Sequence, residues 1–429
     1  MGDLNRTVVL VSLDWFRPGD GRRSLGAASI AAALRDAGAE VRWLDDGVNR
    51  PGFDLADFTN RVVSAAAGLS QPLIGLGCYV WNEPEVLHLI EAIRAAIPAA
   101  EIVLGGPQVS FADAGTLSEA YPGVCYFVRG YGEDAMVSLA TGAAQNGQHG
   151  LFDTSGPDGG ARHDGSLVHL PSPYLTGVLE AGREVRWETQ RGCPFRCSFC
   201  QHREPNLSHR KKPLHEDRLA AELELFARCG VERISVLDPI FHVDRKRAVS
   251  LLGRARALGL RSKVSLQCRL ELIHPDFLEA TRGLDLTLEF GLQTTNLAES
   301  KAVGRRNRMD RCDEGLRAVR ELGIDHEISL IFGLPHQTLG SFLESVQWCL
   351  ERGVPRVRAY PLMLLRGTPI HAEHELWGFA ESGGRISEVV ESFSMSRADN
   401  AEMREVAHWL DRHPGARTLP SRWQKRVAA

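Results

Sequence analysis

The chain has 429 residues, a formal net charge of −4, a hydrophobic content of 43% and a charged content of 24%. This length allows two or three domains, and the composition is that of a globular protein with no bulk attraction for nucleic acid. No apolar run reaches the ~18 residues of a membrane span, residues 1–14 lack the order of a signal peptide, and nine cysteines fit a reducing compartment, so we expect a cytoplasmic protein.

Short apolar segments alternate with amphipathic ones through residues 1–142, which we predict to be one domain. Strands followed by helices in regular alternation indicate a doubly wound parallel sheet. In such sheets ligands bind beyond the carboxyl ends of the strands, so the loops there form a rim. The predicted strands are 7–13, 40–44, 73–78, 101–106 and 126–129, the helices are 24–36, 58–67, 84–96 and 133–140, and the rim loops are 14–23, 79–82, 105–110 and 129–133.

Three stretches of this domain, Ser24–Arg35, Gly105–Ser110 and Arg129–Glu133, resemble a family of cobalamin-binding domains. The resemblance implies a Rossmann-like fold with cobalamin on the rim. The Asp-x-His-x-x-Gly motif, in which a histidine replaces the lower ligand of cobalamin, is absent, because the first loop begins Asp14-Trp-Phe-Arg-Pro-Gly. The alternative to cobalamin binding is a domain that keeps the fold without the cofactor. The rim of such a domain would help to close an active site.

Four rim residues are candidates for contact with cobalamin. Gly105 and Gly106 carry no side chain, so their backbone can approach a flat macrocycle or its nucleotide tail closely. Gln108 follows in the same loop. Trp81 would pack on the lower corrin face, and an ordinary surface or core tryptophan is the alternative for it.

Residues 143–180 are predicted to be a linker. The stretch from Thr141 to His169 is polar, rich in glycine, aspartate and serine, and has no sustained periodicity. His149, His163 and His169 are scattered along it, and we expect all three to be solvated without a shared role.

Three cysteines, Cys193, Cys197 and Cys200, follow at CxxxCxxC spacing. Thiolates bind soft metals and iron–sulfur clusters, and four cysteines are the usual number for a cluster. A cubane held by three thiolates keeps one iron free for a small chelating ligand. Gly192 and Pro194 favour a tight loop over a helix here.

The segment Cys193-Pro-Phe-Arg-Cys197-Ser-Phe-Cys200 resembles the cluster loop of radical S-adenosylmethionine (SAM) enzymes, including the aromatic Phe199 before the last cysteine. Cobalamin-binding domains precede many radical SAM domains. The resemblance implies a [4Fe-4S] cluster whose free iron binds the amino and carboxylate groups of SAM. A zinc knuckle, with His202 as a fourth ligand, and three incidental cysteines are the alternatives.

Six strands with intervening helices are predicted in residues 181–370. Six strand–helix units make a partial (β/α)6 barrel, too few for the closed eight-stranded form, and chemistry belongs at the carboxyl ends of its strands. The cysteine loop follows the first of these strands and so lies at that end. The predicted strands are 185–189, 233–237, 263–266, 285–290, 327–332 and 356–361.

Five residues at the ends of the later strands are candidates for contact with SAM. Asp238 follows the second strand, Arg269 the third, Gln293 and Thr294 the fourth, and Gly333 the fifth. By resemblance they would approach the amine, carboxylate, ribose or adenine of SAM, and a capping or ion-pair role on a loop is the alternative. Residues 371–429 are predicted to form a small, mostly helical cap that supplies contacts to the substrate.

The resemblance extends to about residue 395 and implies a cobalamin-dependent radical SAM methyltransferase of specialised biosynthesis. A small-molecule substrate and an external electron donor of the flavodoxin or ferredoxin type would be its partners. Transfer of a 3-amino-3-carboxypropyl group from SAM to sulfur, phosphorus or arsenic, and a radical rearrangement without methyl transfer, are alternatives among enzymes. A non-catalytic cobalamin or iron–sulfur binding protein is the alternative of another class.

Overall fold

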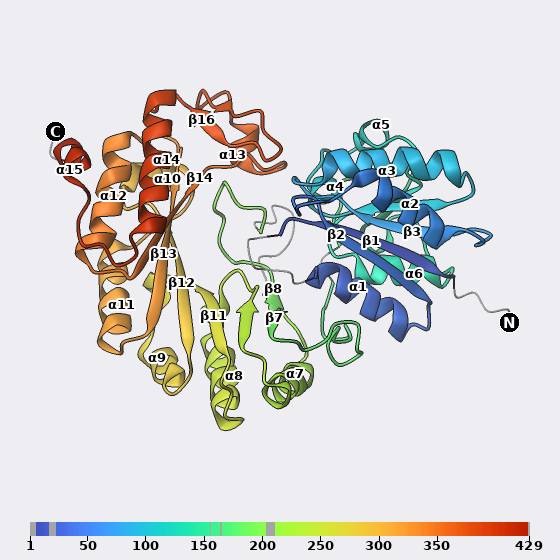
Figure 1. The fold of residues 1–429 in the computed structure, drawn as a ribbon, viewed down its shortest axis with the longest axis horizontal. Coiled ribbons are helices and arrows are strands. Elements are labelled where there is room, and N and C mark those ends of the chain that lie inside the picture. The colour runs from blue at the N-terminus through green and yellow to red at the C-terminus, as the bar shows by residue number, and fades with distance from the viewer. Residues whose placement is uncertain (1–5, 17–22, 155, 164, 203–210, 428–429) are drawn as a thin grey trace. The chain divides into compact units, whose positions relative to one another are not determined.

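The computed structural model describes residues 6–16, 23–154, 156–163, 165–202 and 211–427, so most of the first predicted rim loop lies outside the described residues. The chain forms two compact units, Met1–Ala181 with Leu214–Glu222 and Gly182–Pro213 with Leu223–Ala429. Each unit contains one six-stranded sheet (Figure 1). The two units are described separately below.

The sheet of the first unit has the strand order β2-β1-β3-β4-β5-β6. Five strands are parallel, as the alternation of strands and helices predicts, and β6 pairs antiparallel with β5. The sixth strand, β6, was not predicted, because it lies inside the segment that was expected to be a linker. The strands are β1 (Val8–Asp14), β2 (Val41–Gly47), β3 (Leu73–Gly77), β4 (Glu101–Gly105), β5 (Tyr126–Val128) and β6 (Leu151–Asp153).

Helices cover both faces of this sheet (Figure 1). Phe58 of α2 and Leu89 of α3 pack in one apolar cluster with Val9 and Val11 of β1. Val8 instead belongs to a second cluster, with residues of α1 and α6, because successive side chains of a strand point to opposite faces. The helices are α1 (Leu25–Asp36), α2 (Leu55–Ala66), α3 (Glu83–Ala96), α4 (Pro107–Ser110), α5 (Leu117–Ala120), α6 (Glu133–Ala140) and the 3₁₀ turn η1 (Gln148–Gly150).

The sheet of the second unit has the strand order β14-β13-β12-β11-β10-β7, and every neighbouring pair is parallel. The six predicted strands are therefore confirmed, in sequence order across an open sheet. They are β7 (Glu184–Trp187), β10 (Arg233–Val236), β11 (Lys263–Cys268), β12 (Leu286–Gln293), β13 (Asp325–Phe332) and β14 (Arg356–Pro361). Between β7 and β10 in the sequence, β8 (Gln190–Arg191) and β9 (Lys212–Pro213) form a separate antiparallel pair.

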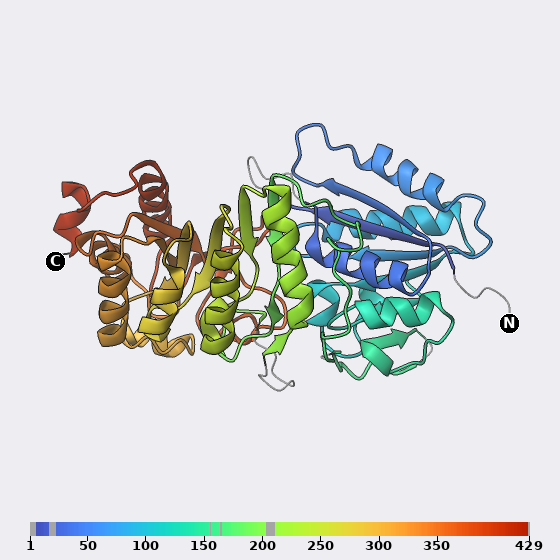
Figure 2. The same ribbon diagram turned by 90° about the horizontal axis from the view of Figure 1, so that it is seen from below.

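The helices that connect these strands lie in a row along one side of the sheet, as a partial barrel requires (Figure 2). Ile328, Leu330 and Phe332 alternate along β13 and are buried, whereas Glu327, just before them, forms an ion pair with Arg358. The connecting elements are α7 (Glu216–Cys229), η2 (Phe241–Val243), α8 (Arg245–Ala257), η3 (Leu270–Leu272), α9 (Pro275–Thr281), α10 (Leu297–Ala302), α11 (Met309–Glu321) and α12 (Leu339–Glu351).

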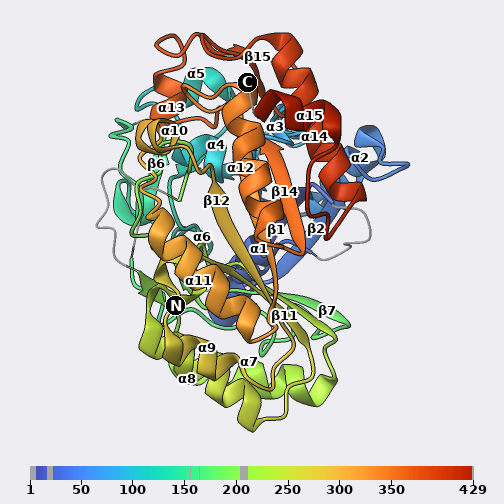
Figure 3. The same ribbon diagram turned by 90° about the vertical axis from the view of Figure 1, so that its left-hand side faces the viewer.

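The end of the chain adds a small group of elements to the second unit. The helix α14 (Arg397–Arg412) packs against β14 and α12, and its first turn is closed by a capping box between Ser396 and Asp399 (Figure 3). The others are α13 (Pro369–Ala372), the antiparallel pair β15 (Ala380–Glu381) and β16 (Val389–Glu391), and α15 (Ser421–Val427). Within the described residues, no helix combines the length and the apolar character needed to cross a bilayer.

Candidate functional site

The cysteine loop begins directly after β7, at the carboxyl end of the second sheet. Cys197 is buried, with 6% of its surface exposed, and Cys193 and Cys200 are half-buried. Phe199 is half-buried between the last two cysteines. The loop therefore presents three thiols at the end of the sheet where a barrel of this kind carries its chemistry.

Backbone hydrogen bonds hold the middle of the loop between two helices. Ser198 donates its N–H to the carbonyl of Val303 at 2.9 Å, just after α10, and its own carbonyl accepts from Ile370 of α13 at 3.2 Å. Within the loop, Cys200 donates to the carbonyl of Cys197 at 3.2 Å. Since these partners are far apart in the sequence, the tertiary fold determines the position of the thiols.

The cysteine sulfurs are spread more widely than zinc ligands. In the described part of the chain, the only three His, Cys, Asp or Glu side chains whose ligand atoms all lie within 4.8 Å of one another are Asp134, His149 and His163. Four ligands at the ~2.3 Å of a zinc–sulfur bond lie about 4 Å apart. This spacing favours a cluster over a zinc knuckle.

A buried arginine lies against the loop. Arg305 is 7% exposed, its Nη1 lies 3.9 Å from Sγ of Cys197, and it donates a second hydrogen bond to the carbonyl of Gly291. Burial lowers the pKa of Arg305, but the cation still favours a neighbouring thiolate over a thiol. Burial also raises the pKa of Cys193 above its usual value. Arg305 was not among the residues predicted for the site. The run of basic residues after α10 is the one feature of the sequence that points to it.

Asp238 anchors the start of the cysteine loop. It is fully buried at the end of β10, where its carboxylate accepts from the N–H of Thr189 at 2.7 Å, from the N–H of Gln190 at 3.2 Å and from the hydroxyl of Thr189. Burial raises the pKa of Asp238 to about 6. Because the side chain is fully engaged, the main chain is the part of this strand end that can meet a ligand.

Arg269 contacts the same loop from the end of β11. It is 3% exposed, donates from Nε to Glu271 at 2.6 Å, and places its guanidinium 3.9 Å from the centre of the Phe195 ring. Such a stacked cation is worth about 0.5–2 kcal/mol, more where it is desolvated. Arg269, which was predicted to contact SAM, therefore also positions the cysteine loop.

Gln293 lies at an irregular end of β12. Its φ of +73° is in the left-handed region, and the pairing with β13 shifts register between Gly291 and Gln293. A bulge of this kind turns a side chain away from the regular sheet direction, and strained backbone outside glycine is concentrated at functional sites. Gln293 is half-buried, so part of its side chain is available to a ligand.

Thr294, by contrast, is fully buried. Its hydroxyl donates to Glu299 at 2.5 Å, and Gln337 donates to the same carboxylate oxygen at 3.1 Å. Oε1 of Gln337 accepts from the N–H of Gly333 at 2.7 Å, so one network joins the ends of β12 and β13. Burial raises the pKa of Glu299. Thr294 therefore offers no surface to a ligand. Gly333 is also buried, and its φ of +92° suits glycine.

On the rim of the first unit, Gly106 is required by close backbone packing. Its φ is +98°, and a Cβ there would lie 2.5 Å from the carbonyl oxygen of Cys78. Gly105 has ordinary φ and room for a Cβ at 3.6 Å from the carbonyl of Val128. Gln108 is 5% exposed and donates to Glu83 at 2.5 Å, so its side chain supports the rim loop.

Trp81 and Tyr79 stack on each other on this rim, with ring centroids 4.6 Å apart and an interplanar angle of 12°. Nε1 of Trp81 donates to the carbonyl of Leu13 at the end of β1, at 3.1 Å. The indole is half-buried, so one flat aromatic surface is held in a fixed orientation at the strand ends. A flat, preorganised surface next to a glycine loop fits a macrocyclic ligand.

The prediction that His149, His163 and His169 are scattered is wrong, although the side chains of His149 and His169 keep 39% and 52% of their surface exposed, as expected for solvated residues. All three imidazoles converge on the carboxylate of Asp134, at the start of α6. The physical reason is that β6 folds back beside β5 and carries the surrounding segment with it.

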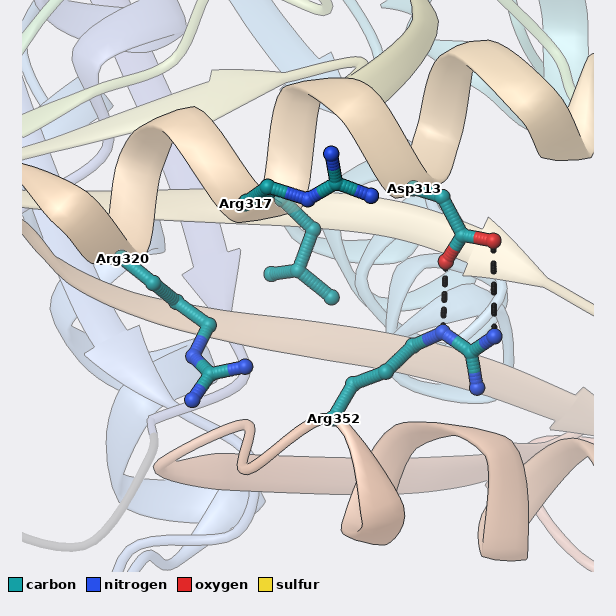
Figure 4. A pocket seen from close by; sticks show the side chains of 5 residues that line it. Asp313, Arg317, Arg320 and Arg352 are labelled. Carbon is teal, nitrogen blue, oxygen red and sulfur yellow. Dashed lines mark hydrogen bonds and ion pairs between the residues drawn. The ribbon is translucent and has the colours of Figure 1, made fainter.

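A cavity of about 230 Å³ lies elsewhere in the second unit (Figure 4). Asp313, Leu316, Arg317 and Arg320 of α11 line it together with Arg352, which follows α12 and forms two hydrogen bonds with Asp313 at 2.5 and 3.4 Å. Arg352 comes just before β14 begins, so the cavity adjoins the amino ends of the strands. The cysteine loop is at the carboxyl ends, and the cavity is therefore separate from the candidate site.

Two family models match the chain. The B12 binding domain matches residues 22–140, and the Radical SAM superfamily matches residues 187–349. The cysteine loop and all five candidate residues for SAM lie in the second match, and all four rim candidates lie in the first.

Two curated proteins are similar over most of this chain. The cobalamin-dependent radical SAM methyltransferase TokK of Streptomyces tokunonensis is 28% identical over 399 residues, 82% of this chain and 56% of TokK. The 2-(S-pantetheinyl)-carbapenam-3-carboxylate methyltransferase of Streptantibioticus cattleyicolor is 27% identical over 413 residues, 84% of this chain and 58% of that protein. The chain thus spans a little over half the length of either relative.

A solved structure has the same fold. The radical SAM methyltransferase TsrM of Kitasatospora setae, with cobalamin and a [4Fe-4S] cluster bound, has a TM-score of 0.69 and 19% identity, over 92% of this chain and 81% of TsrM. At this identity the likeness establishes the architecture, a Rossmann-like sheet followed by a partial barrel.

Proposed function

The chain belongs to the radical SAM superfamily and carries a B12-binding domain ahead of its radical SAM domain, and from this premise we propose that it is a cobalamin-dependent radical SAM methyltransferase acting on a small molecule. The observation that carries the proposal is the pairing of both domains in one chain. Two similar proteins, TokK and the carbapenam enzyme, are named as methyltransferases. Methyl transfer to a carbon of a specialised metabolite is the reaction that this pairing supports best.

Cys193, Cys197 and Cys200 are the proposed ligands of a [4Fe-4S] cluster. Three thiols on a loop held by backbone hydrogen bonds, with the cation of Arg305 beside Cys197, suit an anionic thiolate ligand set. When bound, the cluster would supply the electron that cleaves one SAM molecule, a second SAM molecule would supply the methyl group, and cobalamin would carry that methyl group. The protein binds and orients these groups and excludes water.

Residues at the strand ends of the second unit are assigned to SAM. Gln293 contributes a side chain aimed by the bulge, and Gly333 and the main chain after Asp238 contribute backbone groups. Arg269 orients the loop through Phe195. We assign SAM and the cluster to residues 181–370, cobalamin to residues 1–142, the connection to 143–180 and substrate contacts to the 371–429 cap.

Cobalamin is assigned to the rim formed by Gly106, Gly105 and the loop of Gln108, with the Trp81 indole as the flat surface for the ring. The first loop lacks the Asp-x-His-x-x-Gly motif, so no imidazole is assigned as the lower ligand. Trp81 would help to shield bound cobalamin from water.

A reducing compartment suits this chemistry. The nine cysteines are all free thiols, as in proteins of the cytoplasm, and reduced flavodoxin or ferredoxin is the class of donor that provides single electrons there. We therefore place the protein in the cytoplasm with a donor of that class.

The test needs no knowledge of the natural substrate. Protein reconstituted anaerobically with iron, sulfide and hydroxocobalamin is reduced and incubated with SAM carrying a trideuterated methyl group. We expect 5′-deoxyadenosine from radical cleavage, and S-adenosylhomocysteine with trideuterated methylcobalamin on the protein from methyl loading. Mass spectrometry and chromatography measure all three products.

The alternatives give different products in the same assay. Aminocarboxypropyl transfer gives 5′-methylthioadenosine with unlabelled cobalamin. A radical rearrangement gives 5′-deoxyadenosine alone. A binding protein without catalysis gives none of these products, and that result would overturn the assignment as an enzyme.

A further inference from the structure

Four metal-ligating side chains gather in the first unit, outside the site assigned to cobalamin and SAM. Oδ2 of Asp134 lies 3.0 Å from Nε2 of His163 and 3.9 Å from Nδ1 of His149. Oδ1 of the same carboxylate lies 2.8 Å from Nε2 of His169. The ligand atoms of Asp134, His149 and His163 all lie within 4.8 Å of one another.

The backbone holds these residues in place independently of their side chains. The N–H of His163 donates to the carbonyl of Arg129 at 2.8 Å, and its carbonyl accepts from Tyr131 at 3.3 Å, so His163 is fixed beside the end of β5. Arg129 itself is 1% exposed and forms two hydrogen bonds with Asp158, at 2.9 and 2.5 Å. The segment that carries the imidazoles is thereby anchored to the sheet.

His149 adopts a conformation that is uncommon for a residue with a side chain. Its φ of +51° lies in the left-handed region, inside the turn η1 just before β6. A conformation of this kind persists where the surroundings hold it. In this conformation the ring of His149 meets that of His163 edge-on, with centroids 5.0 Å apart and an interplanar angle of 86°.

The donor set selects a class of ion. Imidazole suits zinc, copper, iron and nickel, whereas magnesium and calcium prefer sites made of oxygen alone. Ligands at the ~2.0–2.1 Å of a zinc–nitrogen bond lie about 3.3 Å apart in a tetrahedron. The 3.0 and 3.9 Å separations of the two imidazole nitrogens from Oδ2 of Asp134 bracket that value.

His169 has a different position from the other two imidazoles. It bonds the carboxylate oxygen that faces away from them. Carboxylates that bind a metal are commonly held by a hydrogen bond of this kind, and its loss typically weakens metal binding about 10–100-fold. Three protein ligands then leave a fourth position for water or another small ligand.

We propose that Asp134, His149 and His163 form a binding site for a divalent transition-metal ion of the zinc class, with His169 positioning Asp134. The ion would link the start of α6, the turn before β6 and the chain around His163, three segments that are distant in the sequence. It would therefore clamp the turn η1 and the chain at His163 onto the end of β5.

Zinc uptake tests the site directly. The iron–sulfur cluster is reconstituted first, so that the cysteines are occupied. The protein is then stripped of loosely bound metal with a weak chelator and titrated with zinc at pH 7.5. Plasma mass spectrometry measures the bound zinc. We expect one bound zinc per chain in the wild type and in the control His88→Ala, whose exposed imidazole lies on α3. The double variant His149→Ala/His163→Ala should bind none, and His169→Ala should bind about 10–100-fold more weakly. Equal zinc in the wild type and the double variant would overturn the proposal.

X-ray absorption on the wild type keeps the test decisive if the double variant fails to fold. Zinc in the proposed site has only nitrogen and oxygen neighbours at about 2.0–2.2 Å and shows the outer scattering of imidazole. Sulfur neighbours at about 2.3 Å would locate the zinc in the cysteine loop and refute the site. A wild-type protein that takes up no zinc would refute it as well.

Discussion

The cysteine loop of the second unit and the histidine cluster of the first both gather metal-ligating atoms at the end of a parallel strand, but they are built differently. Cys193, Cys197 and Cys200 fall within one short loop directly after β7. The side chains around Asp134 come from a helix start, a 3₁₀ turn and the chain at His163 and His169. A local ligand set can be read in the sequence, whereas a set assembled by folding cannot.

The two sites also differ in their charges. A buried cation, Arg305, lies beside Cys197 and favours anionic ligands there. The histidine cluster has a carboxylate at its centre, and its hydrogen bonds with His163 and His169 hold the pKa of Asp134 at about 2, so it stays ionised. The first site is suited to thiolates that bind an iron cluster, and the second to imidazoles around a single divalent ion.

The largest effect should follow from removing one ligand of the local site. Cys197→Ala leaves two thiols for the proposed cluster and should lower the rate of 5′-deoxyadenosine formation at least about 10³-fold, equivalent to about 4 kcal/mol of barrier. Cys229→Ala is the control, since that thiol is exposed at the end of α7. Anaerobic chromatography measures the product. Equal rates in the two variants would remove the cysteine loop from the chemistry.

On the rim of the first unit, two neighbouring glycines allow a matched pair of substitutions. Gly106→Ala forces a Cβ to within 2.5 Å of the Cys78 carbonyl at positive φ, and should lower the free energy of unfolding by about 2–3 kcal/mol and weaken cobalamin retention. Gly105→Ala meets ordinary contacts at 3.6 Å and should cost under about 1 kcal/mol. Urea unfolding and cobalamin absorbance report both effects. Similar losses in both variants would contradict this packing.

The buried arginine tests how far the local site depends on the fold. Arg305→Met removes the donor to the Gly291 carbonyl and the cation beside Cys197, and should lower the free energy of unfolding by about 1–3 kcal/mol and reduce iron retention. The exposed neighbour Arg306 is the control, and Arg306→Met should change stability by under about 0.5 kcal/mol. Denaturation and iron analysis of both variants check this. A neutral Arg305→Met would show that the sequence motif alone positions the thiols.

The smallest effect concerns two carboxylates with opposite pKa shifts. Burial raises the pKa of Asp238 to about 6, so its contribution to stability is present below about pH 4 and is lost as the pH rises through 6. Hydrogen bonds with imidazoles lower the pKa of Asp134 to about 2, so its contribution is present above about pH 4 and is lost as the pH falls through 2.

Between pH 5 and 7.5 the free energy of unfolding of the wild type should therefore fall by roughly 1 kcal/mol relative to Asp238→Asn, which has no proton to lose there. Urea titrations of both proteins at several pH values measure the difference. Parallel pH profiles would mean that Asp238 is not held protonated by burial.

Much of the fold was predictable because apolar periodicity and strand order are local signals. The five parallel strands of the first sheet and all six of the second follow them. The antiparallel β6 was missed because its three residues, Leu151–Asp153, are too few to show a period. Thr294 was predicted at a strand end, but only the packing of Glu299 and Gln337 around it reveals that it is fully buried.

By itself, the sequence determined the two-domain order, the parallel sheets and the identity of the three thiols, because each depends on residues close together along the chain. Only the tertiary structure decided that Arg305 lies against Cys197, that Asp238 anchors Thr189, and that three imidazoles surround Asp134. The physical reason is range: hydrogen bonds and ion pairs act over a few ångströms, and folding alone brings residues distant in the sequence within that reach.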